Sequence, residues 1–140
     1  MSGLTLAADQ LTKYLVVMSL SPGQSLPLIP SVLHLTYVQN TGAAFGLLKG
    51  RHLLFIGISL IVILWIAREL LTHAAGLTST ARRAYALILG GAAGNLIDRI
   101  RVGSVIDFVD LRVWPVFNLG DSAITIGVTL LVWQSMRRHR

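Results

Sequence analysis

Residues 90–122 read GGAAGNLIDRIRVGSVIDFVDLRVWPVFNLGDS and hold four of the six acidic residues of the chain. These four are Asp98, Asp107, Asp110 and Asp121. A carboxylate that is removed from water costs several kcal/mol unless it is paired or protonated. Their concentration in one part of an otherwise apolar chain therefore indicates a polar site, and catalysis is the hypothesis that the remaining sequence has to support.

The composition indicates an integral membrane protein. Of 140 residues, 54% are hydrophobic and 13% are charged, whereas a soluble domain has about 25% charged residues. The net charge is +6, but the basic residues lie at the ends of apolar runs, a pattern that suits anionic lipid headgroups rather than nucleic acid. The chain has no cysteine, which excludes disulfides, a thiol nucleophile and thiolate metal sites.

Outward from this stretch, the apolar runs predict one all-α membrane domain over residues 1–140. We expect four transmembrane helices, at about residues 4–20, 52–71, 82–98 and 121–136, because roughly 20 apolar residues span a bilayer. The glycine-rich GGAAG at residues 90–94 favours close helix packing. Between the spans, LHLTYV at residues 33–38 alternates as a strand does, and VIDFVDL at residues 105–111 reads as a short extended piece, so a small β element is expected in the outer loops.

Four spans place both termini on the same side of the membrane. Lysine and arginine are divided almost evenly between the two sides, six against five. The cluster Arg137, Arg138 and Arg140 directly follows a span and has the most weight, because basic residues next to a span favour the cytoplasmic side. We therefore expect both termini inside, with residues 21–50 and 99–120 outside.

Each polar residue near the predicted outer face has a structural explanation of its own. Asp9 and Lys13 are spaced i, i+4 and can pair on one helix face. Asp98 at a helix C-terminus opposes the helix dipole and needs a cation, which Arg99, Arg101 or Lys13 could supply. Asn118 and Asp121 are good helix N-caps. The topology nevertheless brings a larger set to one membrane face: Asn40, Asn95, Asp98, Arg99, Asp107, Asp110, Asn118 and Asp121.

The residue types in this set limit the chemistry. The chain has no Gly-x-Ser-x-Gly and no HExxH, which argues against a serine triad and a zinc peptidase. What remains is a pair of carboxylates, of which one keeps its proton while the other acts as a base. The residues alone do not say which of the aspartates form that pair.

Five ordered blocks carry a resemblance to a known family. They are DQLTK at residues 9–13, NTGAAF at 40–45, GGAAGNLIDR at 90–99, VIDF at 105–108 and FNLGDSA at 117–123. Together they resemble the lipoprotein signal peptidases (signal peptidase II), which are bacterial membrane aspartyl peptidases. The resemblance implies that Asp107 and Asp121 are the catalytic pair. It implies pocket or supporting roles for Asn40, Asn95, Asp98, Arg99 and Asn118, and a structural role for Asp9 and Lys13.

The resemblance also implies the substrate and the setting. Such enzymes remove signal peptides from diacylglyceryl-modified prolipoproteins by cutting on the amino side of the lipidated cysteine. They lie in the bacterial cytoplasmic (inner) membrane with the active site near the outer leaflet, they need no metal or cofactor, and the cyclic peptide globomycin inhibits them. The expected partners are thus prolipoproteins and membrane lipids, without nucleic acid, and the enzyme is expected to be a monomer.

Two features depart from the family pattern. Gly120 stands where the family usually has Ala, which should loosen the backbone beside Asp121. Asp107 and Asp121 are fourteen residues apart, so the loop that joins them is shorter than in many relatives.

Two other classes of function would each explain part of the sequence. A small transporter or channel would explain the ionisable residues at membrane depth, but it needs a polar path, and residues 53–67 offer only Ser59. A membrane scaffold without activity leaves the aspartates unexplained. The feature that discriminates is the proximity of Asp107 and Asp121, which a peptidase requires and the alternatives do not.

Overall fold

The computed structural model describes residues 1–42 and 52–138. Residues 43–45 of the predicted NTGAAF block, and Arg140 of the C-terminal cluster, lie outside this range. The described chain is mostly helical, with one small antiparallel sheet. Its elements are α1 (Ser2–Ser19), β1 (Ser25–Ile29), β2 (Leu33–Asn40), α2 (His52–Thr72), the short 3₁₀ helix η2 (Ala74–Gly76), α3 (Ser79–Val102), β3 (Val105–Asp110) and α4 (Leu119–Arg138).

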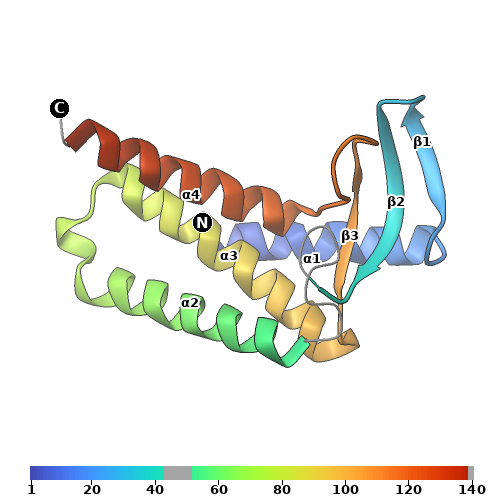
Figure 1. Ribbon diagram of the computed structural model, residues 1–140. Helices are drawn as coiled ribbons and strands as arrows, with labels where there is room; N and C mark the ends of the chain where they lie inside the picture. The colour runs from blue at the N-terminus through green and yellow to red at the C-terminus, as the bar shows by residue number, and fades with distance from the viewer. Residues whose placement is uncertain (43–51, 139–140) are drawn as a thin grey trace.

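Helix α3 is the centre of the helical layer, because it packs against α1, α2 and α4. In Figure 1 the sheet lies at the end of the helices where α1 and α3 finish and α4 begins. Helix α3 starts at Thr78, whose hydroxyl accepts a hydrogen bond from the backbone N–H of Ala81 at 3.1 Å. It stops at Gly103, which has a left-handed φ of 73°, the usual conformation after the last turn of a helix.

The glycines of α3 permit the close packing that the sequence predicts. A Cβ atom on Gly91 would meet the backbone oxygen of Gly120 at the start of α4. A Cβ atom on Gly94 would meet the carboxylate of Asp9 on α1. The central helix therefore lies close to both neighbours, to the backbone of α4 at Gly91 and to the Asp9 side chain of α1 at Gly94.

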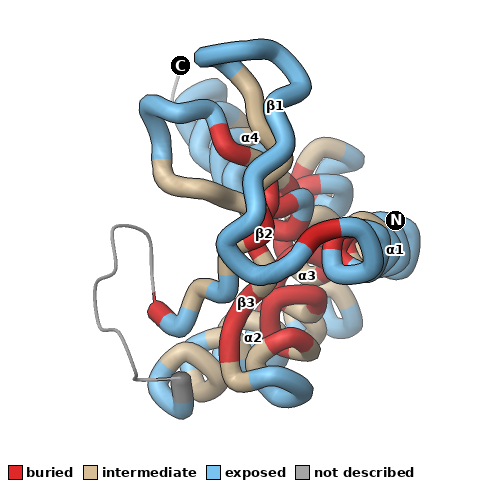
Figure 2. Tube along the Cα trace, turned by 90° about the vertical axis from the view of Figure 1, so that its right-hand side faces the viewer, coloured by how far each residue is buried: buried red, intermediate tan, exposed pale blue. Residues whose placement is uncertain are grey.

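The sheet has the order β1-β2-β3 and is antiparallel throughout. Strands β2 and β3 confirm the extended segments predicted at residues 33–38 and 105–111. Tyr37 and Phe108 pack in a buried cluster with Val16 of α1 and with Leu20, which directly follows α1, so the sheet is held against the C-terminal end of that helix. In Figure 2 the buried parts of α1, α3 and β3 face one another.

Strand β1 lies in a segment for which no strand was expected, and it contains Pro27. All five of its residues are exposed, and it forms one edge of the sheet. A proline is tolerated on an edge strand, where its missing N–H is not needed by a further neighbour.

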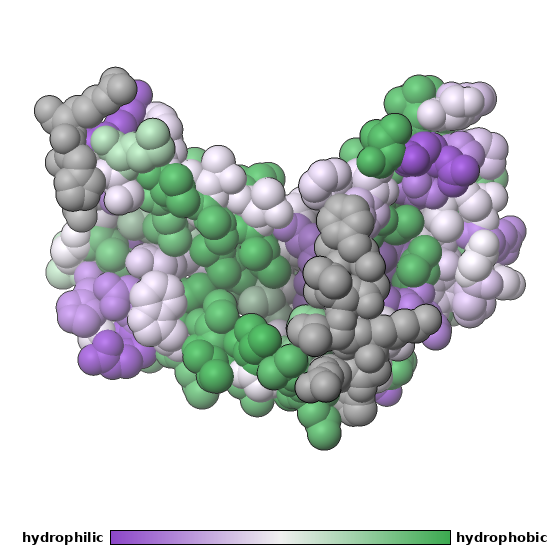
Figure 3. All heavy atoms as spheres, viewed as in Figure 1, coloured by the Kyte–Doolittle hydropathy of each residue, from purple (hydrophilic) through white to green (hydrophobic). Residues whose placement is uncertain are grey.

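One described helix is long and apolar enough to cross a membrane. The segment Leu53–Thr72 of α2 has a mean hydropathy of 2.2, and only 6% of it is buried inside the molecule. The other three predicted spans do not reach the same apolarity within the described residues. Polar side chains within these helices lower their apolarity. Some of these side chains point into the protein, because Asp9 and Lys13 of α1 are only 0% and 2% exposed. Figure 3 shows apolar residues across the middle of the helical layer and hydrophilic residues toward both ends.

Candidate active site

Asp107 and Asp121 line the same cavity, although they come from different elements. Asp107 lies on β3, and Asp121 lies in the first turn of α4. The cavity has a volume of about 270 Å³. Three other predicted residues also line it, namely Asn40, Asn95 and Arg99. We refer to it below as the carboxylate cavity.

Asn118 joins the two aspartates. Its side-chain Nδ2 donates to Oδ1 of Asp107 at 2.7 Å. Its side-chain Oδ1 accepts from the backbone N–H of Asp121 at 2.8 Å, and its own backbone N–H donates to Oδ2 of Asp121 at 3.3 Å. The last two bonds form a reciprocal capping box at the start of α4. The helix cap therefore fixes Asp121 and leaves the amide nitrogen of Asn118 directed at Asp107.

Two further asparagines donate to the carboxylates. Nδ2 of Asn40, at the end of β2, donates to Oδ2 of Asp107 at 2.9 Å. Nδ2 of Asn95, on α3, donates to Oδ1 of Asp121 at 2.7 Å. The side-chain orientation of Asn40 is set by the backbone N–H of Gly42, which donates to its Oδ1 at 3.0 Å. Each oxygen of both carboxylates thus accepts a hydrogen bond, so the two groups are held rigidly.

The environment of Asp107 favours retention of a proton. Burial raises the pKa of Asp107 from 3.8 to about 7, and the charge of Asp121 contributes in the same direction. Hydrogen bonds from Asn40 and Asn118 act against this rise, as does the charge of Lys13. A pair of neighbouring carboxylates with one proton near neutral pH can offer an acid and a base at the same time.

Asp98 lies outside the lining of the carboxylate cavity, which leaves the supporting role that the resemblance also allows. Its carboxylate accepts from Lys13 at 2.7 Å and from the backbone N–H of Ile106 at 3.2 Å. Lys13 is therefore the cation that Asp98 needs, rather than Arg99 or Arg101. Lys13 also pairs with Asp9 at 2.8 Å, as its i, i+4 spacing predicts.

Asp110 and Arg99 have separate roles. Asp110 is buried but does not line the cavity; it accepts from Thr36 at 2.8 Å and pairs with Arg112 at 3.0 Å. Although burial raises its pKa, the hydrogen bonds from Arg112 and Thr36 outweigh this effect and hold the pKa of Asp110 below its usual value.

Arg99 lines the cavity, and its guanidinium lies over the ring of Phe55, 5.2 Å from the centroid.

Several lining residues were not predicted from the sequence. They are Gly42, Val105, Trp114, Pro115, Val116, Phe117 and Thr125. Among them, Trp114 is 60% exposed at the wall of the cavity. A backbone pairing places this segment. Phe117 bonds to Val109 of β3, and residues 114–117 thereby line the same cavity as Asp107.

The amino-acid sequence of the chain matches a known family. The family model for signal peptidase (SPase) II matches residues 1–137. The chain belongs to the signal peptidase II family. It is 52% identical over 133 residues to the lipoprotein signal peptidase of Moorella thermoacetica, a match that covers 94% of this chain and 87% of the relative. It is 49% identical over 130 residues to that of Halothermothrix orenii, with coverage of 90% and 88%.

Solved structures agree with this assignment. A bacterial membrane enzyme at 2.3 Å resolution superposes with a TM-score of 0.89 and 33% sequence identity, over 97% of this chain and 85% of that one. A second bacterial membrane enzyme, at 1.9 Å, gives a TM-score of 0.83 at the same identity, over 95% and 88%. The fold is therefore that of a membrane enzyme, and the chain is a peptidase of the signal peptidase II family, whose members remove signal peptides from lipoproteins.

Proposed function

We propose that Asp107 and Asp121 are the catalytic pair of a membrane aspartyl endopeptidase. The observation that carries the proposal is Asn118, which bonds to both carboxylates at the wall of a single cavity. A transporter or scaffold gives no reason for one buried asparagine to bond to one carboxylate through its side-chain amide and to the other through its backbone N–H. The substrates would be diacylglyceryl-modified prolipoproteins, cut on the amino side of the lipidated cysteine.

The chemistry follows from a pair that shares a proton. The ionised carboxylate takes a proton from a water molecule, and the water oxygen attacks the scissile carbonyl carbon. The protonated carboxyl group donates to the carbonyl oxygen in the same step. When the tetrahedral intermediate collapses, the C–N bond breaks and the departing amine takes up the proton that the first carboxylate removed from water. The second carboxylate regains its proton from a hydroxyl of the intermediate. The lipid and the signal helix would hold the peptide in place, which removes much of the entropic cost of the reaction.

The same proposal includes the arrangement in the bacterial cytoplasmic membrane. We place α1, α2, α3 and α4 across the bilayer, with both termini inside and the sheet end at the outer leaflet. The exposed apolar side chains of α2 support this placement, for example Leu53, Ile61 and Leu64 at 72%, 69% and 66%. Apolar surface on this scale is rare in soluble monomers. A monomer in this orientation would receive its substrate from the lipid.

A cleavage assay tests the substrate class. Purified enzyme in detergent is incubated with a prolipoprotein that carries the diacylglyceryl group, and the product is followed by gel shift. We expect cleavage of the lipidated substrate and inhibition of that cleavage by globomycin. The same prolipoprotein without the lipid is the control. Equal cleavage of both forms, or resistance to globomycin, would contradict the proposed specificity.

The raised pKa of Asp107 predicts how stability depends on pH. Between about pH 4 and 7 the unfolded chain has lost the Asp107 proton while the folded chain keeps it, so stability falls as pH rises through this window. Asp107→Asn removes the titration. We therefore expect its melting temperature in detergent to exceed that of the wild type by more at pH 8 than at pH 5, with a free-energy difference of up to a few kcal/mol.

Asp110→Asn is the matched control for this experiment. The pKa of Asp110 is lowered in the folded state, so its contribution is already complete above the unfolded pKa. We expect Asp110→Asn to lower the melting temperature by a similar amount at pH 5 and pH 8. If the melting temperature of Asp107→Asn also differed from that of the wild type by the same amount at pH 5 and pH 8, the folded protein would not retain the Asp107 proton.

A further inference from the structure

Lys13 is the most deeply buried cation of the described chain, and all three of its protons are engaged. Nζ donates to Asp9 Oδ2 at 2.8 Å, to Asp98 Oδ2 at 2.7 Å and to Asn95 Oδ1 at 2.9 Å. The side chain is 2% exposed. Two carboxylates are sufficient to neutralise this charge, so neutralisation does not explain the third bond, which leads toward the catalytic pair.

The third bond determines the orientation of an amide. Oδ1 of Asn95 accepts from Lys13 at 2.9 Å and from Nδ2 of Asn118 at 3.1 Å, which uses both of its lone pairs. The NH₂ group of Asn95 is then directed at Asp121. An ammonium group can only donate. If the amide of Asn95 were rotated by 180°, its NH₂ group would face the ammonium and its oxygen would face the carboxylate of Asp121.

We propose that Lys13 is a positioning residue for the catalytic pair and acts through Asn95. Its ammonium fixes the Asn95 amide so that an N–H group faces Asp121 and an oxygen atom faces Asn118. Asn118 can then direct its own NH₂ group at Asp107. One cation thereby sets the hydrogen bonds of both carboxylates. This inference rests on the proposed function of Asp107 and Asp121.

The charges around Lys13 predict the direction of its effect. It pairs with Asp9 from α1 and Asp98 from α3, it acts electrostatically on Asp107 from β3 and Asp121 from α4, and Arg101 from α3 lines the same cavity. The positive charge of Lys13 lowers the pKa of Asp107. Without this cation the pair would keep its protons to higher pH. The acidic limb of the kcat/KM profile, where the pair must lose its first proton, would then move to higher pH.

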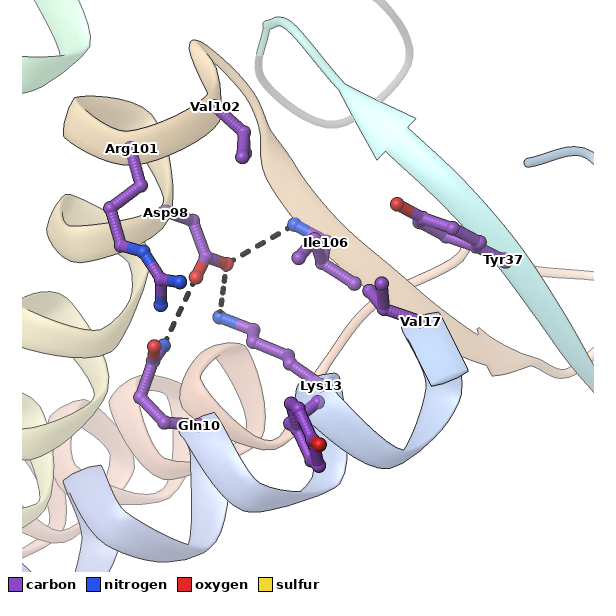
Figure 4. Close-up of a pocket in the computed structure, with 9 residues that line it drawn as sticks. Gln10, Lys13, Val17, Tyr37, Asp98, Arg101, Val102 and Ile106 are labelled. Carbon is purple, nitrogen blue, oxygen red and sulfur yellow. Dashed lines mark hydrogen bonds and ion pairs between the residues drawn. The ribbon is translucent and has the colours of Figure 1, made fainter. Parts of the chain in front are cut away.

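Lys13 can be reached from the side away from the substrate. A second cavity of about 150 Å³ is lined by Lys13, Gln10, Asp98, Arg101 and Ile106, among others, and Figure 4 shows Lys13 and Asp98 paired at its wall. Ile106 lines this cavity, whereas its neighbours Val105 and Asp107 line the carboxylate cavity. Since successive side chains of a strand point to opposite faces, β3 separates the two spaces.

The first test removes the ammonium while keeping the net charge that the cluster has in the wild type. Lys13→Met combined with Asp98→Asn takes away one cation and one anion, and Asp98→Asn alone is the matched control that keeps the bond from Lys13 to Asn95. Relative to the control, we expect the double variant to lose about tenfold or more in kcat, with little change in KM. We also expect its acidic limb to lie at higher pH. Identical pH profiles and kcat values within about twofold would overturn the role of Lys13.

The second test restores the donor from solution. Lys13→Ala enlarges the second cavity, which ethylammonium can enter and where it can donate to Asn95. Tetramethylammonium carries the same charge without an N–H group. We expect ethylammonium to restore activity and tetramethylammonium to fail. Equal activity with both cations, or none with either, would contradict the proposal.

The catalytic role of Asp107 and Asp121 and the positioning role of Lys13 can be contradicted separately. If Asp107→Asn is active, the proposed catalytic pair is wrong. If Asp107→Asn is inactive while the Lys13 double variant behaves as Asp98→Asn does, the catalytic pair stands and only the role of Lys13 is wrong.

Discussion

Asp107→Asn is expected to lower kcat/KM for a lipidated prolipoprotein by about 10²–10⁴-fold, and Asp121→Asn is expected to do the same. Either substitution leaves a single titratable carboxyl group in the cavity, which cannot serve as acid and base in one step. The amide has nearly the shape of the carboxyl group, so the fold should be retained. The measurement is the initial rate of cleavage over a range of substrate concentrations, with melting temperatures as a test of folding.

The control for this prediction lies on the same strand. Asp110 is a buried carboxylate three residues beyond Asp107, but it binds Thr36 and Arg112 rather than the residues of the cavity. We expect Asp110→Asn to reduce stability and to keep kcat/KM near that of the wild type. A loss of activity in Asp110→Asn equal to that in Asp107→Asn would show that the sheet, and not the pair, limits catalysis.

Gly91→Ala is expected to destabilise the helical layer strongly. The added methyl group would overlap the backbone oxygen of Gly120 in α4. The side chain of Ile124, also in α4, lies beside it. Backbone cannot move aside as a flexible side chain can, so α3 and α4 would have to separate. Overpacking of this kind costs about 1–3 kcal/mol and occasionally more. Because Gly120 precedes Asp121, we expect activity to fall as well.

Gly57→Ala supplies the matched control for the packing prediction. Gly57 lies in α2, and a Cβ atom there meets nothing within 4 Å. Alanine favours helix over glycine by about 1 kcal/mol, so this variant should be neutral or slightly more stable. Melting temperatures in detergent compare the two. If Gly91→Ala melts no lower than Gly57→Ala, the contact between α3 and α4 is not the reason for the glycine.

Periodicity and composition predict the helices well and their ends less well. Residues 52–71 were expected to span, and α2 extends over His52–Thr72. Residues 82–98 were expected in the third helix, but α3 runs over Ser79–Val102. The extra turn carries Arg99 and Arg101, which were expected in the outer segment of residues 99–120. Helix caps at Thr78 and Gly103 set the true ends.

The partners within the site depend on contacts that no local pattern contains. The sequence left Asp98 with three candidate cations, and the one that binds it is Lys13, 85 positions away in the chain. The choice of Asp107 over Asp98 and Asp110 came from the resemblance to the family alone. In the structure these three carboxylates differ by their neighbours: Asp98 meets an ammonium, Asp110 meets Thr36 and Arg112, and Asp107 meets two amides and Asp121.

Two explanations that competed for Asn118 and Asp121 are compatible. The pair forms the N-terminal cap of α4, as their residue types predict, and the same geometry holds Asp121 beside the cavity. Gly120, between them, was expected to loosen this turn. Instead its N–H donates to Asp9 at 2.7 Å, and a Cβ atom there would lie 3.0 Å from Asp9 Oδ1 and from the backbone oxygen of Gly91. Close packing of the turn is the physical reason that a larger residue would fit poorly in this chain.

The most direct test of the central claim is a double-mutant cycle on Asp107 and Asp121. Cleavage of the lipidated prolipoprotein is measured for Asp107→Asn, Asp121→Asn and the double variant, each verified as folded. Groups that act as one unit have strongly non-additive effects. We therefore predict that the double variant is no slower than the slower of the two single variants. Losses that multiply, or a single variant with wild-type activity, would contradict a catalytic pair.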